Sequence, residues 1–153
     1  MFTDRARRRS ISVYHLHLGG ADAAALEWRA LLAPRFQVRL KQLGVCVVDA
    51  ASAADVVVVT GLLTARNLDR AMLVLEAMPT PSVLVAAGDE AIDGGMWVAS
   101  DVPGLAPYPL THYADVSLLV PGSPPSPEAL LEALGAAARL VANPNVSPDT
   151  VDG

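Results

Sequence analysis

The sequence predicts an open, mostly parallel α/β sheet that is flanked by helices and forms a single domain. Apolar runs dominated by Val, Leu and Ala alternate along the chain with amphipathic segments, a pattern typical of strands joined by helices. The composition is 52% hydrophobic but only 5% aromatic, as expected for small aliphatic layers between parallel strands and helices. The 153 residues suffice for one buried core. We therefore expect right-handed crossovers and a functional site beyond the carboxyl ends of the strands.

The first strand is expected over residues 10–18, where several side chains are β-branched or aromatic. Gly19 and Gly20 follow it directly and predict a sharp turn. The segment AAALEWRALL, residues 23–32, has the apolar spacing of a helix, and Asp22 stands where an N-cap residue would be. The chain thus begins its globular part with a strand, a glycine turn and a helix.

Apolar runs at residues 45–48 and 56–60 predict the next two strands, and the second has no alternation, as expected for a parallel strand covered on both faces. Residues 65–78 repeat apolar side chains at spacings of three and four, which indicates a helix. Another apolar strand is expected over 82–87, before the polar loop GDEAIDGG, residues 88–95. Each of these strands ends in a glycine-containing loop.

The segment 96–112 is rich in Pro and Gly and is expected to be irregular. A last strand is expected over 115–120, followed by the rigid turn PGSPPSPE and a helix over 128–141 with Pro127 in its first turn. The carboxyl edge of the sheet should then gather the glycine turn, the loop after residue 60, the GDEAIDGG loop and the PGSPP turn.

The charge pattern excludes a general nucleic-acid-binding surface, because the net charge is -5 and the dense basic run is confined to the N-terminus. We divide the chain into a basic tail, residues 1–9, a globular domain, residues 10–141, and a disordered tail, residues 142–153. The arginines of the first tail would either reach an acidic partner or anionic lipid, or remain solvated.

Cys46 is the single cysteine, so an internal disulfide is excluded and no disulfide partner is expected. Its apolar neighbours in the run VCVV predict a buried, unreactive thiol. Asp49 and Asp55 interrupt the longest apolar stretch, which falls short of the roughly 18 to 20 residues that cross a bilayer. We expect a cytoplasmic protein that is soluble by itself and docks to a membrane assembly.

Four motifs occur in one order along the chain: GGADAAALEWRALL, VVVVTGLLT, MPTPSVLVAAG and VPGSPPSPEALLEAL. Together they resemble the small, iron-sulfur (20 kDa-type) subunit of complex I and of energy-converting nickel-iron hydrogenases. That family carries a Cys-x-x-Cys-x-x-Glu stretch, a valine-rich strand ending in Thr-Gly, a Gly-x-Cys loop and Pro-Gly-Cys-Pro-Pro. The resemblance covers roughly residues 10 to 141 and implies a flavodoxin-like sheet.

In this resemblance the four cysteines that hold the family's 4Fe-4S cluster fall on Ala21, Ala24, Glu90 and Ser123. Such clusters are held by deprotonated thiolates, and an alanine methyl group has no lone pair to offer. Cys46 lies outside the motif and cannot restore the set. The resemblance therefore predicts that the cluster and any other metal are absent, and that no electron passes at this position.

Other family positions are retained. Glu27 matches the glutamate that in the family lies toward the large subunit and is linked to proton or quinone chemistry, so it is a candidate proton relay or else a solvated helix carboxylate. Gly61 and Thr64 match a strand-to-helix turn in which Thr64 could cap the next helix. A rigid loop that shapes the interface is expected from Pro121, Gly122, Pro124 and Pro125.

Two further clusters of polar residues have open interpretations. Asp89, Glu90 and Asp93 could form an acid-base pair, hold a hard cation or simply fill the vacated cluster pocket. His15 and His17 lie two apart on a strand and share a face, but zinc would need further ligands, so an interface or core position is the alternative.

The resemblance implies a cluster-less structural or coupling subunit that is not catalytic alone. Its partners would be a hydrogenase-like or complex I-like large subunit and membrane-arm subunits, on the cytoplasmic face of the inner membrane. A second hypothesis is a subunit that completes a quinone or substrate pocket around another subunit's centre. A third is a free-standing flavodoxin-like domain that binds a flavin or nucleotide or assists assembly.

Overall fold

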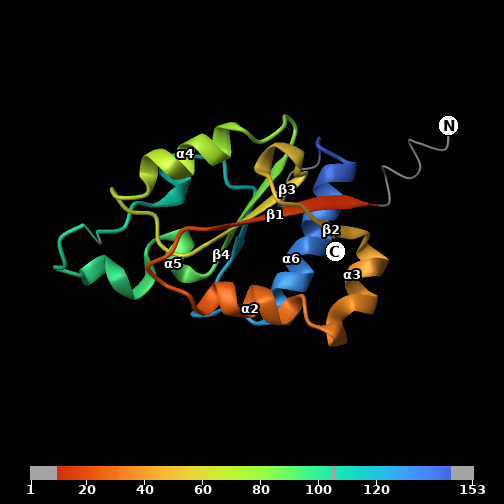
Figure 1. Ribbon diagram of the computed structural model, residues 1–153, viewed down its shortest axis with the longest axis horizontal. Coiled ribbons are helices and arrows are strands. Elements are labelled where there is room, and N and C mark those ends of the chain that lie inside the picture. Colours follow the sequence, from red (N-terminus) through yellow and green to blue (C-terminus); the bar gives the residue numbers. More distant parts are fainter. Residues whose placement is uncertain (1–9, 105, 146–153) are drawn as a thin grey trace.

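The computed structural model describes residues 10–104 and 106–145. The predicted basic tail, residues 1–9, lies outside the described residues, as do residues 146–153 of the predicted C-terminal tail. The described chain forms a five-stranded sheet with the order β2-β1-β3-β4-β5, in which every neighbouring pair is parallel (Figure 1). The strands are β1 Ile11–His17, β2 Val45–Val47, β3 Val56–Thr60, β4 Val83–Ala87 and β5 Leu118–Val120. This confirms the predicted fold class.

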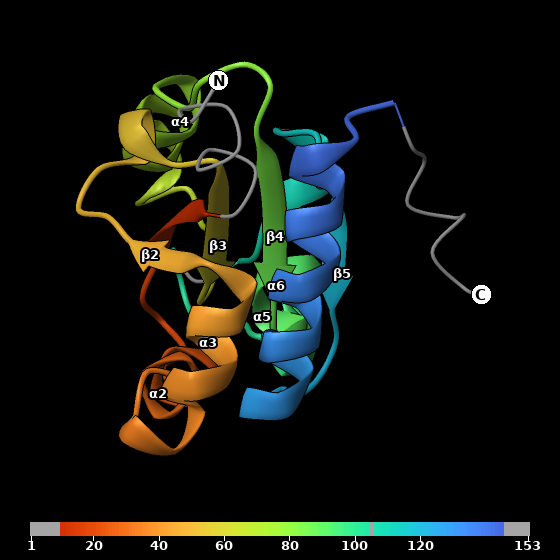
Figure 2. The same cartoon turned by 90° about the vertical axis from the view of Figure 1, so that its right-hand side faces the viewer.

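Helices cover both faces of the sheet. The α-helices are α2 Ala23–Leu31, α3 Gln37–Leu43, α4 Leu68–Glu76, α5 Asp89–Ile92 and α6 Pro127–Ala142. Short 3-10 helices occur at η1 Pro34–Phe36, η2 Ala51–Ala53, η3 Gly95–Ala99 and η4 Leu110–His112. Helices α2, α3 and α6 lie on one face, whereas α4 lies on the other (Figures 1 and 2).

The two faces of the central strands carry separate apolar cores. On β3, Val56 and Val58 pack with Trp28 of α2 and the leucines of α6, while Val57 and Val59 pack with α4 and η4 on the other side. Every residue of β3 and β4 is buried, which explains why these strands show no alternation in the sequence. Each buried valine or leucine side chain contributes about 1.5–3 kcal/mol relative to an exposed one.

The ends of α6 follow from its sequence. The Ser126 hydroxyl oxygen accepts a hydrogen bond from the Ala129 backbone N–H over 3.1 Å, and Pro127 occupies the first turn, as predicted. The helix runs one residue beyond the predicted end, to Ala142. None of the helices in the described part of the chain combines the length and the apolar character needed to cross a membrane.

The sequence did not predict α3, which buries only Leu40 and ends at Gly44 with a φ of 72°. The prediction that Cys46 is buried was wrong, because its side chain is exposed. Strand β2 pairs with β1 alone and lies at the edge of the sheet, so the apolar run VCVV is not enclosed by either core. The predicted loop 88–95 contains the short helix α5.

Candidate functional site

Loops from four strands meet at the carboxyl edge of the sheet. The loop after β1 contacts the loop after β3, because Leu62 N–H donates to the Gly19 carbonyl over 2.8 Å. The loop after β4 contacts the loop after β5, where Asp89 N–H donates to the Gly122 carbonyl over 2.9 Å. These contacts bring together the glycine turn, the Thr-Gly turn, the GDEAIDGG loop and the PGSPP turn, as the predicted topology required.

The first pair of loops approaches so closely that Gly61 has no room for a side chain. A Cβ atom at Gly61 would lie 2.7 Å from the carbonyl oxygen and 2.8 Å from the nitrogen of Gly19, and its φ is +86°. Gly19 and Gly20 also have positive φ values, of 81° and 76°, which only glycine adopts readily. The three glycines therefore set the shape of this half of the edge.

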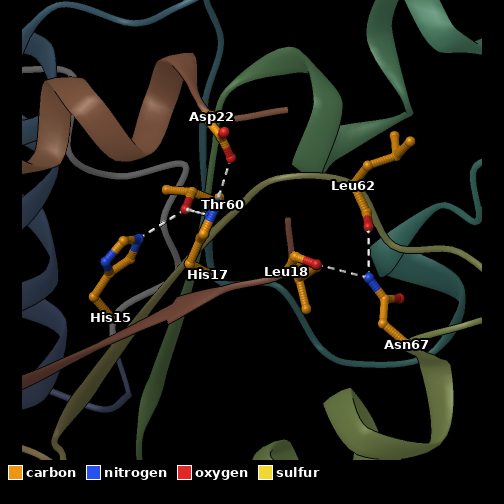
Figure 3. Close-up of polar contacts among 7 residues, drawn as sticks. All are labelled: His15, His17, Leu18, Asp22, Thr60, Leu62 and Asn67. Carbon is orange, nitrogen blue, oxygen red and sulfur yellow. Dashed lines mark hydrogen bonds and ion pairs between the residues drawn. The ribbon is translucent and has the colours of Figure 1, made fainter. Parts of the chain in front are cut away.

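Asn67 fastens these two loops together. Its Nδ2 donates to the carbonyls of Leu18, over 3.0 Å, and Leu62, over 2.8 Å (Figure 3). Its Oδ1 accepts from the Thr64 N–H over 2.8 Å. The predicted cap by Thr64 was wrong, because Asn67 stands at the N-cap of α4 and the Thr64 side chain makes no capping bond. The sequence does carry a signal for Asn67, which is an asparagine directly before an amphipathic segment.

The second pair of loops contains the positions of the predicted degenerate cluster. A Cβ atom at Gly88 would lie 3.1 Å from Ala24 Cβ, 3.2 Å from Glu90 Oε2 and 3.8 Å from the Gly122 carbonyl. Ser123 Oγ donates to Glu90 Oε1 over 3.3 Å. We call this arrangement of Ala24, Gly88, Glu90, Gly122 and Ser123 the Gly88 cradle.

Ala21 lies three residues before Ala24 and is partly exposed in the loop that leads into α2. The proline loop after β5 is tight, since a Cβ atom at Gly122 would lie 2.6 Å from the nitrogen of Pro125. Pro125 is buried, whereas Pro121 and Pro124 are exposed. The structure thus gathers three of the four cluster positions at one cradle and shapes one side of it with this loop.

The three acidic residues after β4 do not form one site. Glu90 is only 7% exposed and points into the Gly88 cradle, whereas the Asp89 carboxylate accepts from Gly122 N–H over 2.8 Å and holds the proline loop. Asp93 is exposed and accepts from Gly95 N–H in its own turn. Among the described residues, no group of three or more His, Cys, Asp or Glu side chains could hold a metal ion.

The side chains at the four cluster positions do not fit a four-thiolate iron-sulfur cluster. Two methyl groups, one carboxylate and one hydroxyl stand at the four positions, and soft sulfur ligands are required. Cys46 pairs with Ser12 near the beginning of β1, whereas the cradle lies at the opposite, carboxyl edge of the sheet. The single thiol therefore cannot serve this position.

A chain of polar side chains occupies the other half of the edge. Thr60 Oγ1 lies 2.7 Å from His15 Nε2 and 3.0 Å from His17 Nδ1, and His17 Nε2 lies 2.9 Å from Asp22 Oδ1 (Figure 3). Thr60 is fully buried at the end of β3. The two histidines share a face, as predicted, but the contributions of Thr60 and Asp22 were missed. Asp22 stands at the N-cap position of α2, as predicted, but its carboxylate makes no capping bond and contacts His17 instead.

His15 lies between β1 and α2, where its ring centroid is 5.4 Å from that of Trp28. Burial lowers the pKa of His15 to about 4, and the nearby positive charges of His17 and Arg29 act in the same direction. His15 is therefore neutral at physiological pH.

Glu27 lies on α2 beside the buried Trp28 and is partly exposed. Within the described residues its carboxylate has no hydrogen-bond or ion-pair partner. Its proposed role as a proton relay thus stays a prediction, and the position is accessible to a partner.

The comparisons with known proteins agree with this architecture. The family described as "NADH ubiquinone oxidoreductase, 20 Kd subunit" matches residues 16–137. The "Probable membrane-bound hydrogenase subunit mbhJ" of Pyrococcus furiosus is 34% identical over 123 residues, which are 80% of this chain and 71% of the relative. An NAD(P)H-quinone oxidoreductase subunit K from Synechococcus sp. is 30% identical over 130 residues, 85% of this chain and 51% of the relative.

Two solved structures share the fold. A chain of the membrane-bound sulfane sulfur reductase, an archaeal respiratory membrane complex, has a TM-score of 0.73 at 21% identity, covering 95% of this chain and 78% of that chain. A chain of an NAD+-reducing NiFe hydrogenase has a TM-score of 0.62 at 17% identity, covering 86% of this chain and 92% of that chain. The match over residues 16–137 confirms the resemblance drawn from the four motifs, and the chain belongs to the family of the 20 kDa subunit of NADH ubiquinone oxidoreductase.

Proposed function

We propose that this protein is a cluster-less structural or coupling subunit of a membrane-associated oxidoreductase complex of the hydrogenase-like or complex I-like type. In that complex it would bridge the large subunit to the membrane arm, at the cytoplasmic face of the inner membrane. Family membership and the names of the relatives, which include a membrane-bound hydrogenase subunit and a quinone oxidoreductase subunit, support this assembly.

The observation that carries the cluster-less part of the proposal is the position of Glu90. Its carboxylate is buried in the Gly88 cradle, with Oε2 3.2 Å from the point where a Gly88 Cβ would be and Oε1 bonded to Ser123. Oxygen ligands are hard donors, and they cannot replace the soft thiolates on which an iron-sulfur cluster depends. Without those donors the chain would transfer no electrons at this position.

Hydrogen bonds from side chains to the backbone hold the loops of the carboxyl edge together. The Asp89 carboxylate holds the proline loop through Gly122 N–H, and the Asn67 amide holds the other two loops through the Leu18 and Leu62 carbonyls. Each such bond contributes about 0.5–1.5 kcal/mol, and a charged acceptor strengthens it. These contacts support a role as architecture, since no metal centre is needed to organise the loops.

The assembly and the missing cluster can be tested on one preparation. We expect the tagged full-length chain, isolated from detergent-solubilised membranes of its host, to bring with it a large-subunit homologue and membrane subunits. A monodisperse yellow monomer would instead favour the free-standing flavin-binding domain. Glu27, which is partly exposed on α2, would then be tested in the intact complex, where unchanged turnover of Glu27→Gln would remove it from the mechanism.

The cluster is tested by anaerobic reconstitution of the purified full-length chain with ferrous iron and sulfide. The wild type should retain no stoichiometric iron or acid-labile sulfide, because two of the four positions have no donor atom. The matched comparison carries Ala21→Cys, Ala24→Cys, Glu90→Cys and Ser123→Cys and should bind about four irons per chain. Stoichiometric iron and sulfide in the wild type, with a reducible paramagnetic signal, would refute the cluster-less function.

A further inference from the structure

The hydrogen bonds among His15, Thr60, His17 and Asp22 form one continuous path. The path begins at the His15 imidazole, which packs on Trp28 of α2. It passes through the buried Thr60 hydroxyl to His17 and ends at the exposed Asp22 carboxylate (Figure 3). The three separations are 2.7, 3.0 and 2.9 Å, all within hydrogen-bond distance. The side-chain exposures of His17 and Asp22 are 34% and 76%, so the path leads from the interior to solvent.

The number of hydrogens on Thr60, His15 and His17 allows two patterns of donors and acceptors along this path. A threonine hydroxyl has one hydrogen, so Thr60 can donate to only one of the two imidazoles and must accept from the other. When His17 is neutral and donates from Nε2 to Asp22, its Nδ1 is an acceptor. Thr60 then donates to His17, and His15 must donate from Nε2.

Protonation of His17 reverses the two inner bonds. Both nitrogens of the His17 cation are donors, so Nδ1–H donates to Thr60 Oγ1 while Nε2–H still donates to Asp22. The Thr60 hydrogen must turn toward His15 Nε2, which has to be an acceptor, so the neutral His15 carries its hydrogen on Nδ1. The protonation state of the exposed His17 imidazole thus determines the tautomer of the partly buried His15.

We propose that His15, Thr60, His17 and Asp22 form a proton relay between the His15 imidazole, which packs against Trp28 of α2, and the exposed rim of the carboxyl edge. A proton that arrives at His15 Nδ1 displaces the Nε2 proton to Thr60, and Thr60 passes its own hydroxyl proton to His17 Nδ1. The charge then rests on His17 beside Asp22, and no electron is transferred. Passage in the opposite direction restores the starting tautomers.

The surroundings of the path favour this direction of charge movement. Burial disfavours a cation at His15, and the proximity of His17, on β1, and the positive charge of Arg29, on α2, act in the same direction. At the other end of the path the Asp22 carboxylate, at the start of α2, lies 2.9 Å from His17 Nε2, and β3 contributes the neutral Thr60 hydroxyl. His15 would therefore pass a proton on and not store it. The relay does not depend on whether the Gly88 cradle holds a cluster.

The test follows the imidazole nitrogens of the 15N-labelled full-length chain by long-range proton-nitrogen NMR between pH 5 and 8. In the wild type, His15 should carry its hydrogen on Nε2 at pH 8 and on Nδ1 at pH 5. The change should have the same midpoint as the protonation of His17. Thr60→Ser keeps the hydroxyl and should keep this coupling, whereas Thr60→Val should abolish it.

A second variant keeps the test decisive if Thr60→Val does not fold. His17→Gln removes the titrating group while leaving Thr60 in place, so His15 should then hold one tautomer throughout the pH range. A wild-type His15 that keeps a single tautomer while His17 titrates would overturn the relay. Unaltered coupling in folded Thr60→Val would do the same, because the hydroxyl would not be the connection.

Discussion

The close approach of the loops after β1 and β3 makes Gly61 a backbone position at which even a methyl group should destabilise the fold. In Gly61→Ala, the new Cβ would lie 2.7 Å from the Gly19 oxygen and 2.8 Å from the Gly19 nitrogen, so the loops must separate. Separation endangers the hydrogen bonds from Leu62 N–H to Gly19 and from Leu18 N–H to Thr60, both 2.8 Å long. The methyl group thus meets backbone atoms that cannot rotate away.

Two contributions make up the expected loss of stability. The left-handed backbone at a φ of +86° costs an alanine about 1–2 kcal/mol. Loss or lengthening of the two hydrogen bonds adds about 0.5–1.5 kcal/mol for each. We therefore expect Gly61→Ala to lower the free energy of unfolding by roughly 2–5 kcal/mol.

Gly19→Ala is the matched control, because its φ is +81° but a Cβ there meets nothing within 4 Å. It should show the backbone contribution alone, about 1–2 kcal/mol. Both variants are measured by urea unfolding, followed by far-ultraviolet circular dichroism and linear extrapolation. Equal losses in the two variants would show that the close contact between the loops does not restrict Gly61, and the packing argument would fail.

Two further predictions concern stability. Gly135→Ala, in α6, should raise the free energy of unfolding by about 0.5–1 kcal/mol, because the methyl group would meet only Arg139 Nη1 at 3.8 Å and Leu43 Cδ2 at 3.9 Å; a loss in urea unfolding would contradict this. Folding lowers the pKa of His15 from 6.5 to about 4. The contribution of the neutral His15 to the free energy of unfolding is therefore complete above pH 6.5 and is lost as the pH falls toward 4. Between pH 7.5 and pH 5 the wild type should lose about 2 kcal/mol more stability than His15→Gln, and parallel pH profiles would contradict the shift.

The sequence predicted those strands and helices whose side chains are buried against other elements of the protein. Strands β3 and β4 are buried at every position, so their continuous apolar runs could be recognised without knowing their neighbours. Helix α6 has a proline in its first turn and buried leucines at helical spacing, which fixed its location within one residue at either end. Such signals depend only on residues that are close together in the chain, so they can be recognised from the sequence alone.

The elements at the edge of the fold, such as α3 and β2, were harder to predict from the sequence. Helix α3 has one buried residue, Leu40, among seven, so no apolar stripe distinguished it from a loop. The run around Cys46 looked like a buried strand, but the place of β2 at the sheet's edge is decided by strand order, which depends on distant segments. Asn67 and Thr60 join loops from different parts of the chain, so their partners could not be predicted from spacing.

Helix α2 connects the two halves of the carboxyl edge. Its preceding residue, Asp22, contacts His17 in the polar path, and Ala24, two residues later, packs against Gly88 in the cradle beside Glu90. The polar path and the Gly88 cradle therefore meet at the beginning of α2, and a partner that contacts this part of the edge would encounter both.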